Sequence, residues 1–202
     1  MKLLIGLLKP SSGKVLVDGS DLNEMKLESY YKHIAYVSQE APVFDGTIRE
    51  NLVFDRKVSD DQIMESLEKV GLNQLISQLE QGLDTPVGEK GITLSGSERQ
   101  RLALARLFFS DAKIVILDEA TSAMDNLTEQ SVMENLLKYL KGKTIIMIAH
   151  RLTSIKDVDR IIVLKAGKIE GDGDYHTLIE NNPYFSALAL KEENDLQQKQ
   201  ID

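Results

Sequence analysis

The hydrophobic pattern of the first 40 residues predicts the end of a helix and two short strands. Residues 3–8 are almost continuously apolar and are expected to be the last turns of a helix, which Lys9-Pro10 would stop. Val15–Val17 predicts a strand that turns at Asp18-Gly19. Ile34–Val37 predicts a second strand, after which the chain becomes polar.

The middle of the chain carries apolar residues at helical spacing. Ser59 and Gln62 predict a capping box at the start of one helix, and Gly71 is expected to end it. Ser95 and Glu98 have the same spacing and predict a capping box for a later helix. This region is therefore interpreted as a helical insertion.

The pattern then returns to alternating strands and helices. Ile114–Leu117 is a continuous apolar run, which is typical of a parallel strand buried on both faces. A helix that Gly142 ends is followed by another predicted buried strand, Thr144–Ala149. A hairpin over residues 161–169 and a last helix from Tyr175 complete an α/β chain with a mostly parallel sheet.

Composition narrows the possible chemistry. The chain has 202 residues, 24 basic and 32 acidic side chains, a net charge of −8 and no cysteine. Disulfides, thiolate metal sites and a cysteine nucleophile are therefore excluded, and the acidic balance argues against binding nucleic acid by bulk charge. The apolar runs are far shorter than the roughly 20 residues that a membrane helix needs.

Polar residues follow three of the predicted strands. Gln39, Asp118-Glu119 and His150 each stand just after a strand, where open parallel sheets bind ligands. Of two adjacent carboxylates, one can hold Mg²⁺ while the other orients an attacking water. Acidic residues placed against the dipole of a following helix would have the same pattern, and both interpretations stay open.

The turn Ser95-Gly96-Ser97-Glu98 allows two interpretations as well. It would present backbone N–H groups, a hydroxyl and the positive end of a helix to an anion. An ordinary capped helix would account for Ser95 and Glu98 equally well.

Taken together, these segments resemble the nucleotide-binding domain of ATP-binding cassette (ABC) transporters. The family's motifs match in order: Gln39 resembles the Q-loop glutamine, Leu94–Arg106 the signature and its helix, Ile114–Glu119 the Walker B strand, Ala120–Asp125 the D-loop, and His150 the switch histidine. The resemblance covers residues 1 to about 190. It implies a P-loop NTPase (RecA-like) core over residues 1–40 and 111–190, a helical subdomain over 41–110, and a polar tail over 191–202.

The resemblance implies ATP and Mg²⁺ as cofactors and assigns roles at the strand ends. Asp118 and Gln39 would hold the metal, and Glu119 would polarise the attacking water. Gln39 would also couple the metal and the water to the helical subdomain, and His150 would contact the γ-phosphate. Glu119, His150 and Gln39 are therefore the expected catalytic residues.

Other residues would act across an interface, because the family's ATP sites form between two domains placed head to tail. Ser95, Gly96 and Ser97 would reach ATP held by the partner domain, and Asp125 would bridge the two domains. Ser97 and Glu98 depart from the family's Leu-Ser-Gly-Gly-Gln, adding a side chain and a negative charge near the phosphates.

The expected partners are a second nucleotide-binding domain and the transmembrane domain of an exporter, with no nucleic acid. Thr85–Gly91 is similar to the exporter loop that touches the transmembrane part, and Val43–Leu52 also resembles an exporter segment, although plain solvated loops remain an alternative for both. The implied location is the cytoplasmic face of a membrane, with a soluble protein if the chain acts alone.

The pattern lacks the phosphate-binding loop G-x-x-x-x-G-K-[ST]. Gly142-Lys143-Thr144 stands between a helix and a strand, which is the reverse of what that loop requires. We interpret the chain as an N-terminally truncated domain without its first strands and phosphate loop. The strand feeding that loop is expected beside Ile114–Leu117, so that its loss would expose a central edge.

Three functional hypotheses follow. The first is the ATPase domain of an exporter, incomplete in this chain, whose hydrolysis alone is expected to be near background. The second is a non-catalytic partner that contributes its signature face to ATP bound on another subunit. The third is a nonfunctional gene remnant.

Overall fold

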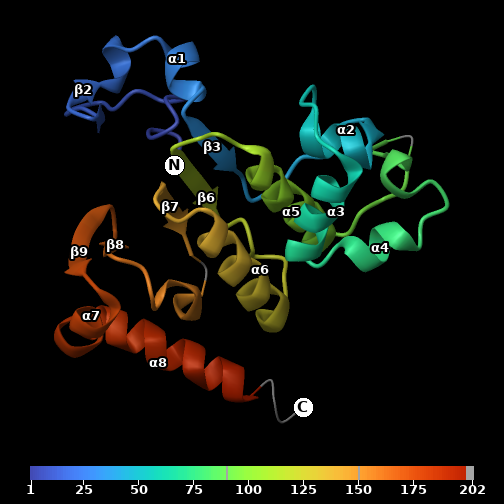
Figure 1. Ribbon diagram of the computed structural model, residues 1–202. Coiled ribbons are helices and arrows are strands. Elements are labelled where there is room, and N and C mark those ends of the chain that lie inside the picture. The colour runs from blue at the N-terminus through green and yellow to red at the C-terminus, as the bar shows by residue number, and fades with distance from the viewer. Residues whose placement is uncertain (90, 150, 199–202) are drawn as a thin grey trace. The chain divides into compact units, whose positions relative to one another are not determined.

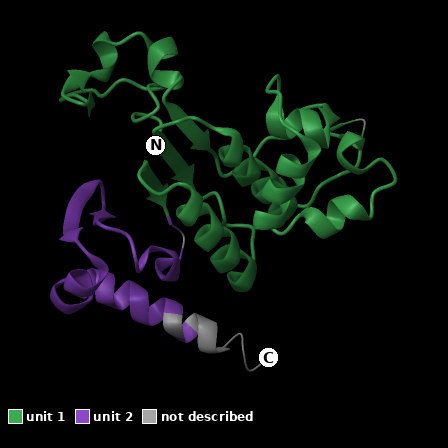
Figure 2. Ribbon diagram, viewed as in Figure 1, with its two compact units in different colours: residues 1–148 green, residues 149–202 purple. Residues whose placement is uncertain are grey.

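A computed structural model describes residues 1–89, 91–149 and 151–198. The chain forms two compact units, residues 1–148 and 149–202, which are treated separately below (Figure 2). His150, one of the predicted site residues, lies outside the described residues.

The first unit contains short strands, helices and 3-10 turns (Figure 1). In chain order they are β1 (Leu16–Val17), β2 (Ser20–Asp21), η1 (Leu22–Glu24), α1 (Leu27–Tyr31), β3 (Ile34–Val37), β4 (Gly46–Thr47), α2 (Ile48–Val53), α3 (Asp60–Lys69), α4 (Asn73–Ser77), η2 (Gly82–Asp84), β5 (Pro86–Val87), α5 (Gly96–Ala105), η3 (Arg106–Phe109), β6 (Ile114–Asp118), α6 (Asn126–Tyr139) and β7 (Thr144–Ile148).

A parallel sheet in the order β3-β6-β7 forms the centre of this unit. Ile34 pairs with Ile114, and Ile114 pairs in turn with Thr144, so the three strands run in register. Side chains 115–117 of β6 are buried on both faces, which confirms the strand predicted from the continuous apolar run. The α/β fold with a parallel sheet is therefore confirmed.

The prediction that a further strand lies beside Ile114–Leu117 is wrong. A strand has two edges, and those of β6 are taken by β3 and β7. Among the described residues, β7 pairs on one side only, with β6. Consistent with an edge position, its side chains are half-buried or exposed rather than fully buried. The strand predicted over 144–149 exists, but it is an edge strand of this sheet.

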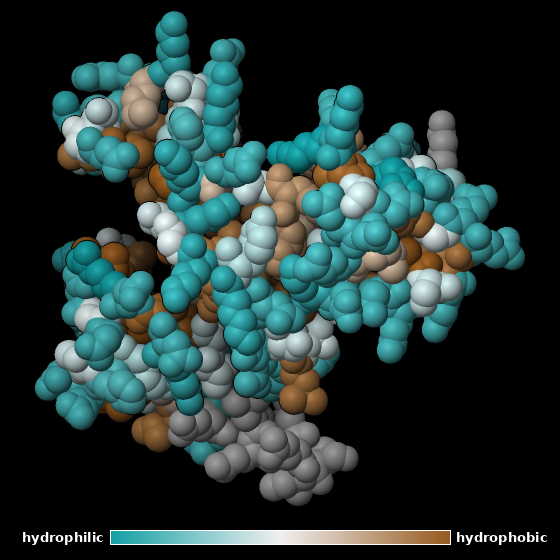
Figure 3. Space-filling model, viewed as in Figure 1, coloured by the Kyte–Doolittle hydropathy of each residue, from teal (hydrophilic) through white to brown (hydrophobic). Residues whose placement is uncertain are grey.

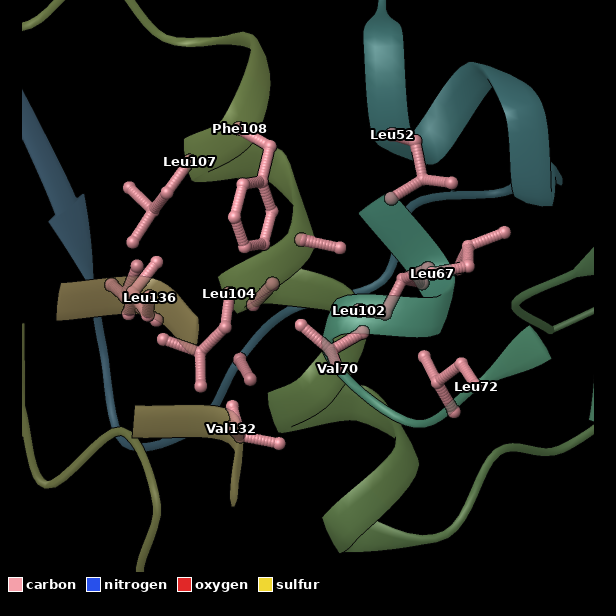
Figure 4. Packing of buried hydrophobic residues seen from close by; sticks show 14 of the residues in the cluster. Leu52, Leu67, Val70, Leu72, Leu102, Leu104, Leu107, Phe108, Val132 and Leu136 are labelled. Carbon is pink, nitrogen blue, oxygen red and sulfur yellow. The ribbon is translucent and has the colours of Figure 1, made fainter. Parts of the chain in front are cut away.

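The helices between β3 and β6 gather on one side of the sheet and share its hydrophobic core (Figure 1). Figure 4 shows Leu104, Leu107 and Phe108 facing Val132 and Leu136 of α6. The capping boxes predicted at Ser59 and Ser95 are confirmed. Their side chains accept bonds from the first-turn N–H groups, and their own N–H groups donate to Gln62 and Glu98. Local sequence therefore sets where these helices begin.

The first eight residues differ from the prediction. They form successive turns rather than the end of a regular helix. Gly6 adopts a φ of +71°, which interrupts a right-handed helix at that point. Tyr30 and Tyr31 hold the turns by donating hydroxyl hydrogen bonds to the carbonyl oxygens of Leu4 and Ile5.

The second unit is a hairpin followed by helices. Its elements are η4 (Leu152–Ile155), β8 (Ile161–Lys165), β9 (Lys168–Gly173), α7 (Tyr175–Asn181) and α8 (Pro183–Gln198). The predicted hairpin is confirmed, and the helical region after Tyr175 is divided into two helices, the second of which begins at Pro183. Phe185 is buried and packs edge-on against Tyr175, with ring centroids 5.5 Å apart. Helix α8 continues into the predicted polar tail as far as Gln198.

The surface is mainly hydrophilic, as expected for a chain in which 28% of the residues are charged. On the face shown in Figure 3, hydrophilic side chains predominate and hydrophobic ones appear in scattered patches. Within the described parts of the chain, no helix is long and apolar enough to cross a membrane.

Candidate functional site

The carboxyl ends of β3 and β6 place three predicted site residues at one edge of the sheet. Asp118 is the last residue of β6, Glu119 follows it directly, and Gln39 comes two residues after β3. Because the strands are parallel neighbours, these residues leave the sheet at the same edge. Gln39 is exposed, whereas Asp118 and Glu119 are half-buried.

A tyrosine that sequence reasoning missed binds the first carboxylate. The hydroxyl of Tyr36 donates to Oδ2 of Asp118 across the two strands at 2.9 Å. Desolvation first, and then the hydrogen bond and charge of Asp118, raise the pKa of Tyr36 to about 12. No local pattern could have shown this contact, because it depends on the strand register: Tyr36 pairs with Ile116, which shares a face with Asp118.

The backbone turns sharply at the second carboxylate. Glu119 has a φ of +50°, a left-handed conformation that non-glycine residues rarely adopt. Its N–H donates to the carbonyl oxygen of Ile148 at 3.3 Å, and its own carbonyl accepts from the N–H of Ser122 at 3.2 Å. The side chain of Glu119 is thus carried by a bend that backbone bonds hold on both sides.

The signature-like turn begins a full helix. Ser95 caps α5, with its Oγ accepting from the N–H of Glu98 at 3.2 Å. The carboxylate of Glu98 accepts from the N–H of Ser95 at 2.7 Å, so this donor is already used within the chain. Gly96 and Ser97 remain in the first turn, where N–H groups have no carbonyl partner within the helix. Their donors, with the exposed Ser95, are the groups that could meet an anion.

A buried glutamine on α5 joins this helix to the sheet edge. Nε2 of Gln100 donates to the carbonyl oxygens of Gln39 and Glu119, at 3.2 and 3.4 Å, and to Oγ of Ser122 at 3.1 Å. Oε1 of Gln100 accepts from the N–H of Ala123 at 2.9 Å. Sequence reasoning missed this residue. Its only signal was a glutamine on a helix whose residues 102–105 are apolar.

Asp125 begins helix α6. It accepts from the N–H of Thr128 at 3.0 Å and from the Thr128 hydroxyl at 2.6 Å. These bonds hold the pKa of Asp125 below its usual value of 3.8, the hydroxyl being the larger cause. A capping role is therefore visible, while the predicted bridge to a second domain stays a prediction.

The two segments with exporter character lie against each other. β4 pairs with β5 through Gly46 and Val87, and the N–H of Glu89 donates to Oδ1 of Asp45 at 2.7 Å. Gly88 allows this approach, because a Cβ there would stand 2.2 Å from the Asp45 carboxylate. Residues 43–52 and 85–89 are thus joined into one surface.

An aromatic pair stands beside that surface. Phe44 and Phe54 are both about half exposed, and their rings meet edge to face at 6.1 Å. The guanidinium of Arg106 lies 5.6 and 5.5 Å from the two ring centroids. Arg106 also donates to the carbonyl oxygens of Asn51 and Pro42, at 2.7 and 3.1 Å. The half-buried cation of Arg106 therefore contacts both rings.

The oxygen atoms at the sheet edge suit magnesium. Among the described residues, no three acidic or histidine side chains come together as a metal cage. A single half-buried carboxylate, Asp118, at the end of β6 matches Mg²⁺, which keeps several waters and takes few protein ligands. The residues present fit this ion better than Zn²⁺, which prefers nitrogen and sulfur ligands.

Comparison with known proteins agrees with this geometry. The sequence model of a protein family described as ABC transporter matches residues 1–122. The chain belongs to the ABC transporter family. The mitochondrial iron-sulfur clusters transporter ATM1 of Debaryomyces hansenii is 42% identical over 198 residues. That match covers 96% of this chain and 28% of the relative.

Other members of the ABC transporter family give the same result. ABC transporter B family member 17 of Arabidopsis thaliana is 39% identical over 93% of this chain and 16% of its own length. A solved structure of a bacterial Atm1-family ABC exporter with ATP bound superposes with a TM-score of 0.88. It is 32% identical and is matched over 95% of this chain and 34% of its own. The chain thus spans about a third or less of the length of these transporters.

Proposed function

We propose that this chain is the ATP-binding and ATP-hydrolysing domain of an exporter, and that it shares its ATP sites with a second such domain. The observation that carries the proposal is the sheet edge itself. Gln39, Asp118 and Glu119 leave neighbouring parallel strands, and Gln100 ties that edge to the helix of the signature-like turn. Family membership supports the same proposal.

Within the chain, the two carboxylates at the end of β6 would have different roles. Asp118 and Gln39 would hold Mg²⁺, which when bound neutralises charge on the phosphates. Tyr36 would keep one oxygen of Asp118 in place through its hydroxyl. Glu119 would orient the attacking water from its backbone bend, and His150 would contact the γ-phosphate.

Across the interface, the start of α5 would complete the partner's site. Ser95, Gly96 and Ser97 would offer a hydroxyl and N–H donors to the γ-phosphate of ATP held by the second domain. Asp125 would contact that domain while it caps α6. The division into a core over 1–40 and 111–190 and a helical subdomain over 41–110 belongs to the same proposal.

The surface over 43–52 and 85–89 would receive the transmembrane part of the exporter. Exposed Phe44 within it and exposed Phe54 beside it are available for apolar contact, and backbone bonds between its segments hold it together. The domain would then work at the cytoplasmic face of the membrane.

The second candidate function is a chain that only lends its signature face to ATP held by an intact partner domain. The 202 residues contain no G-x-x-x-x-G-K-[ST] loop. Reading the gene upstream of Met1 separates the two candidates: an in-frame loop with transmembrane helices before it supports the exporter domain, and a stop codon supports the lending partner.

Mixing experiments test the shared site that both candidates require. The chain is added to the nucleotide-binding domain of the bacterial Atm1-family exporter, and ATP hydrolysis is followed with Mg²⁺ present. We expect hydrolysis above the sum of the separate proteins. Ser95→Arg should reduce this excess about a hundredfold, because it replaces a preorganised donor by a bulky cation.

Ser77→Arg is the matched control, since Ser77 is an exposed serine of α4 remote from α5 in sequence. It should leave the excess unchanged. The 202-residue chain alone should bind ATP weakly, with no saturation at micromolar concentrations. An excess that Ser95→Arg does not alter would contradict the shared site.

A further inference from the structure

We propose that Gln100 is a positioning residue that holds the signature helix against the catalytic strand ends. The contact geometry carries the mechanical part of this inference. Its consequence for ATP hydrolysis rests on the function proposed above.

The amide of Gln100 holds three separate backbone segments at once. It binds the segment after β3 through Gln39, the bend after β6 through Glu119, and the following segment through Ser122 and Ala123. The first of these contacts spans 61 residues of sequence. Displacing α5 from any of the three segments would therefore break a hydrogen bond inside the protein.

The chemistry of the site calls for an uncharged group that both donates and accepts. Nε2 faces oxygen atoms and Oε1 faces an N–H, so the orientation of the Gln100 amide follows from its partners. The side chain is only 3% exposed, which makes unpaired polar atoms costly there. A leucine would leave two carbonyl groups without this donor, and a glutamate would set a carboxylate oxygen against them.

A second contact reinforces the coupling. A Cβ built on Gly96 would lie 3.5 Å from the Cβ of Ala123, so the first turn of α5 approaches the same segment that Gln100 binds. Gln100 also binds the carbonyl of Glu119, the residue with the left-handed backbone. A shift at the signature turn is thereby transmitted to the residue proposed to orient water.

Amide hydrogen exchange on the full chain tests the mechanical part without nucleotide. In Gln100→Leu, exchange over residues 119–124 and 38–41 should rise about tenfold or more, because the N–H of Ala123 loses its acceptor and the two segments lose their donor. Gln100→Glu should produce the same rise at the two carbonyl segments. The helix over residues 60–69 serves as the internal reference.

Leu104→Val is the matched control, because Leu104 is fully buried on the same helix and has no polar side-chain atoms. It should loosen α5 generally without singling out the two segments. Equal exchange patterns in Gln100→Leu and Leu104→Val would overturn the proposal.

Mixing with the Atm1-family nucleotide-binding domain adds the catalytic readout. Gln100→Leu should lower the maximal excess hydrolysis about tenfold while leaving the chain concentration for half-maximal effect within about twofold. Leu104→Val, which only destabilises the helix, should not lower the maximal excess hydrolysis while leaving the chain concentration for half-maximal effect unchanged.

The two proposals fail separately. If the wild-type chain produces no excess hydrolysis while the exchange pattern holds, the proposed function is wrong and the coupling through Gln100 stands. If hydrolysis is stimulated but neither the exchange nor the maximal rate responds selectively to Gln100→Leu, the positioning role is wrong.

Discussion

Asp125 combines a local role, capping a helix, with the proposed role at the interface with a second domain. Its carboxylate caps α6 by accepting two hydrogen bonds from Thr128. The motif pattern pointed to an interface role, whereas the structure adds a capping role that the spacing of Asp125 and Thr128 could have predicted. The two roles are compatible, because the side chain is exposed.

The capping role predicts a pH dependence. The folded state holds the pKa of Asp125 below 3.8, so its stabilising contribution is fully present above the unfolded pKa and is lost as pH falls through the folded one. Asp125→Asn keeps the cap but cannot titrate. We expect the free energy of unfolding to fall less steeply below about pH 4 in Asp125→Asn than in wild type.

Chemical denaturation at a series of acidic pH values measures these slopes. Asp111→Asn provides the control, since Asp111 is an exposed aspartate that precedes a strand instead of capping a helix. Identical slopes for wild type and Asp125→Asn would count against a cap whose charge matters.

Arg106 contacts the rings of both Phe44 and Phe54. Burial lowers the pKa of Arg106. Its guanidinium N–H groups donate hydrogen bonds to the carbonyl oxygens of Asn51 and Pro42. Arg106→Leu should reduce the free energy of unfolding by about 1–3 kcal/mol, because two carbonyl groups lose their partner. Urea unfolding with an unchanged m-value measures the loss. Arg56→Leu, at an exposed arginine, should change stability little, and a similar loss there would contradict the explanation.

At the scale of elements, the ends of helices could be predicted from local sequence, whereas the position of a strand in the sheet could not. The capping boxes of α3 and α5 and the glycine after α3 are visible in a few consecutive residues, so they could be predicted. The position of β7 could not. Its apolar run resembles that of β6, and only the pairing order shows that one strand is central and the other lies at an edge.

The edge position of β7 predicts association through that strand. Its five residues, Thr144–Ile148, are mostly apolar and pair on one side only among the described residues. Ile148→Lys should reduce self-association of the 202-residue chain, because a lysine on an edge strand opposes pairing with another chain. Light scattering over a concentration series measures the effect.

Leu127→Lys is the matched control, with the same change in charge at an exposed position on α6. It should leave scattering nearly unchanged. An equal decrease in both variants would mean that net charge, rather than the strand edge, governs association.

At the scale of the whole molecule, the candidate site is a product of topology. Gln39 and Asp118 are far apart in sequence, and they share an edge only because β3 and β6 are parallel neighbours. Their motifs could be recognised from the sequence, since strand ends followed by polar residues form a local pattern. The contacts of Tyr36 and Gln100 could not, because each depends on which segments meet in space.

The sequence by itself determined the class of the fold, the starts of the main helices and the residues at the strand ends. These features depend on neighbouring residues, whose periodicity and capping chemistry act over a few positions. Tertiary structure alone decided that β6 is central, that β7 is an edge, and that one buried amide joins α5 to the bend at Glu119. Those outcomes depend on the pairing of distant segments, which no local pattern in a single sequence specifies.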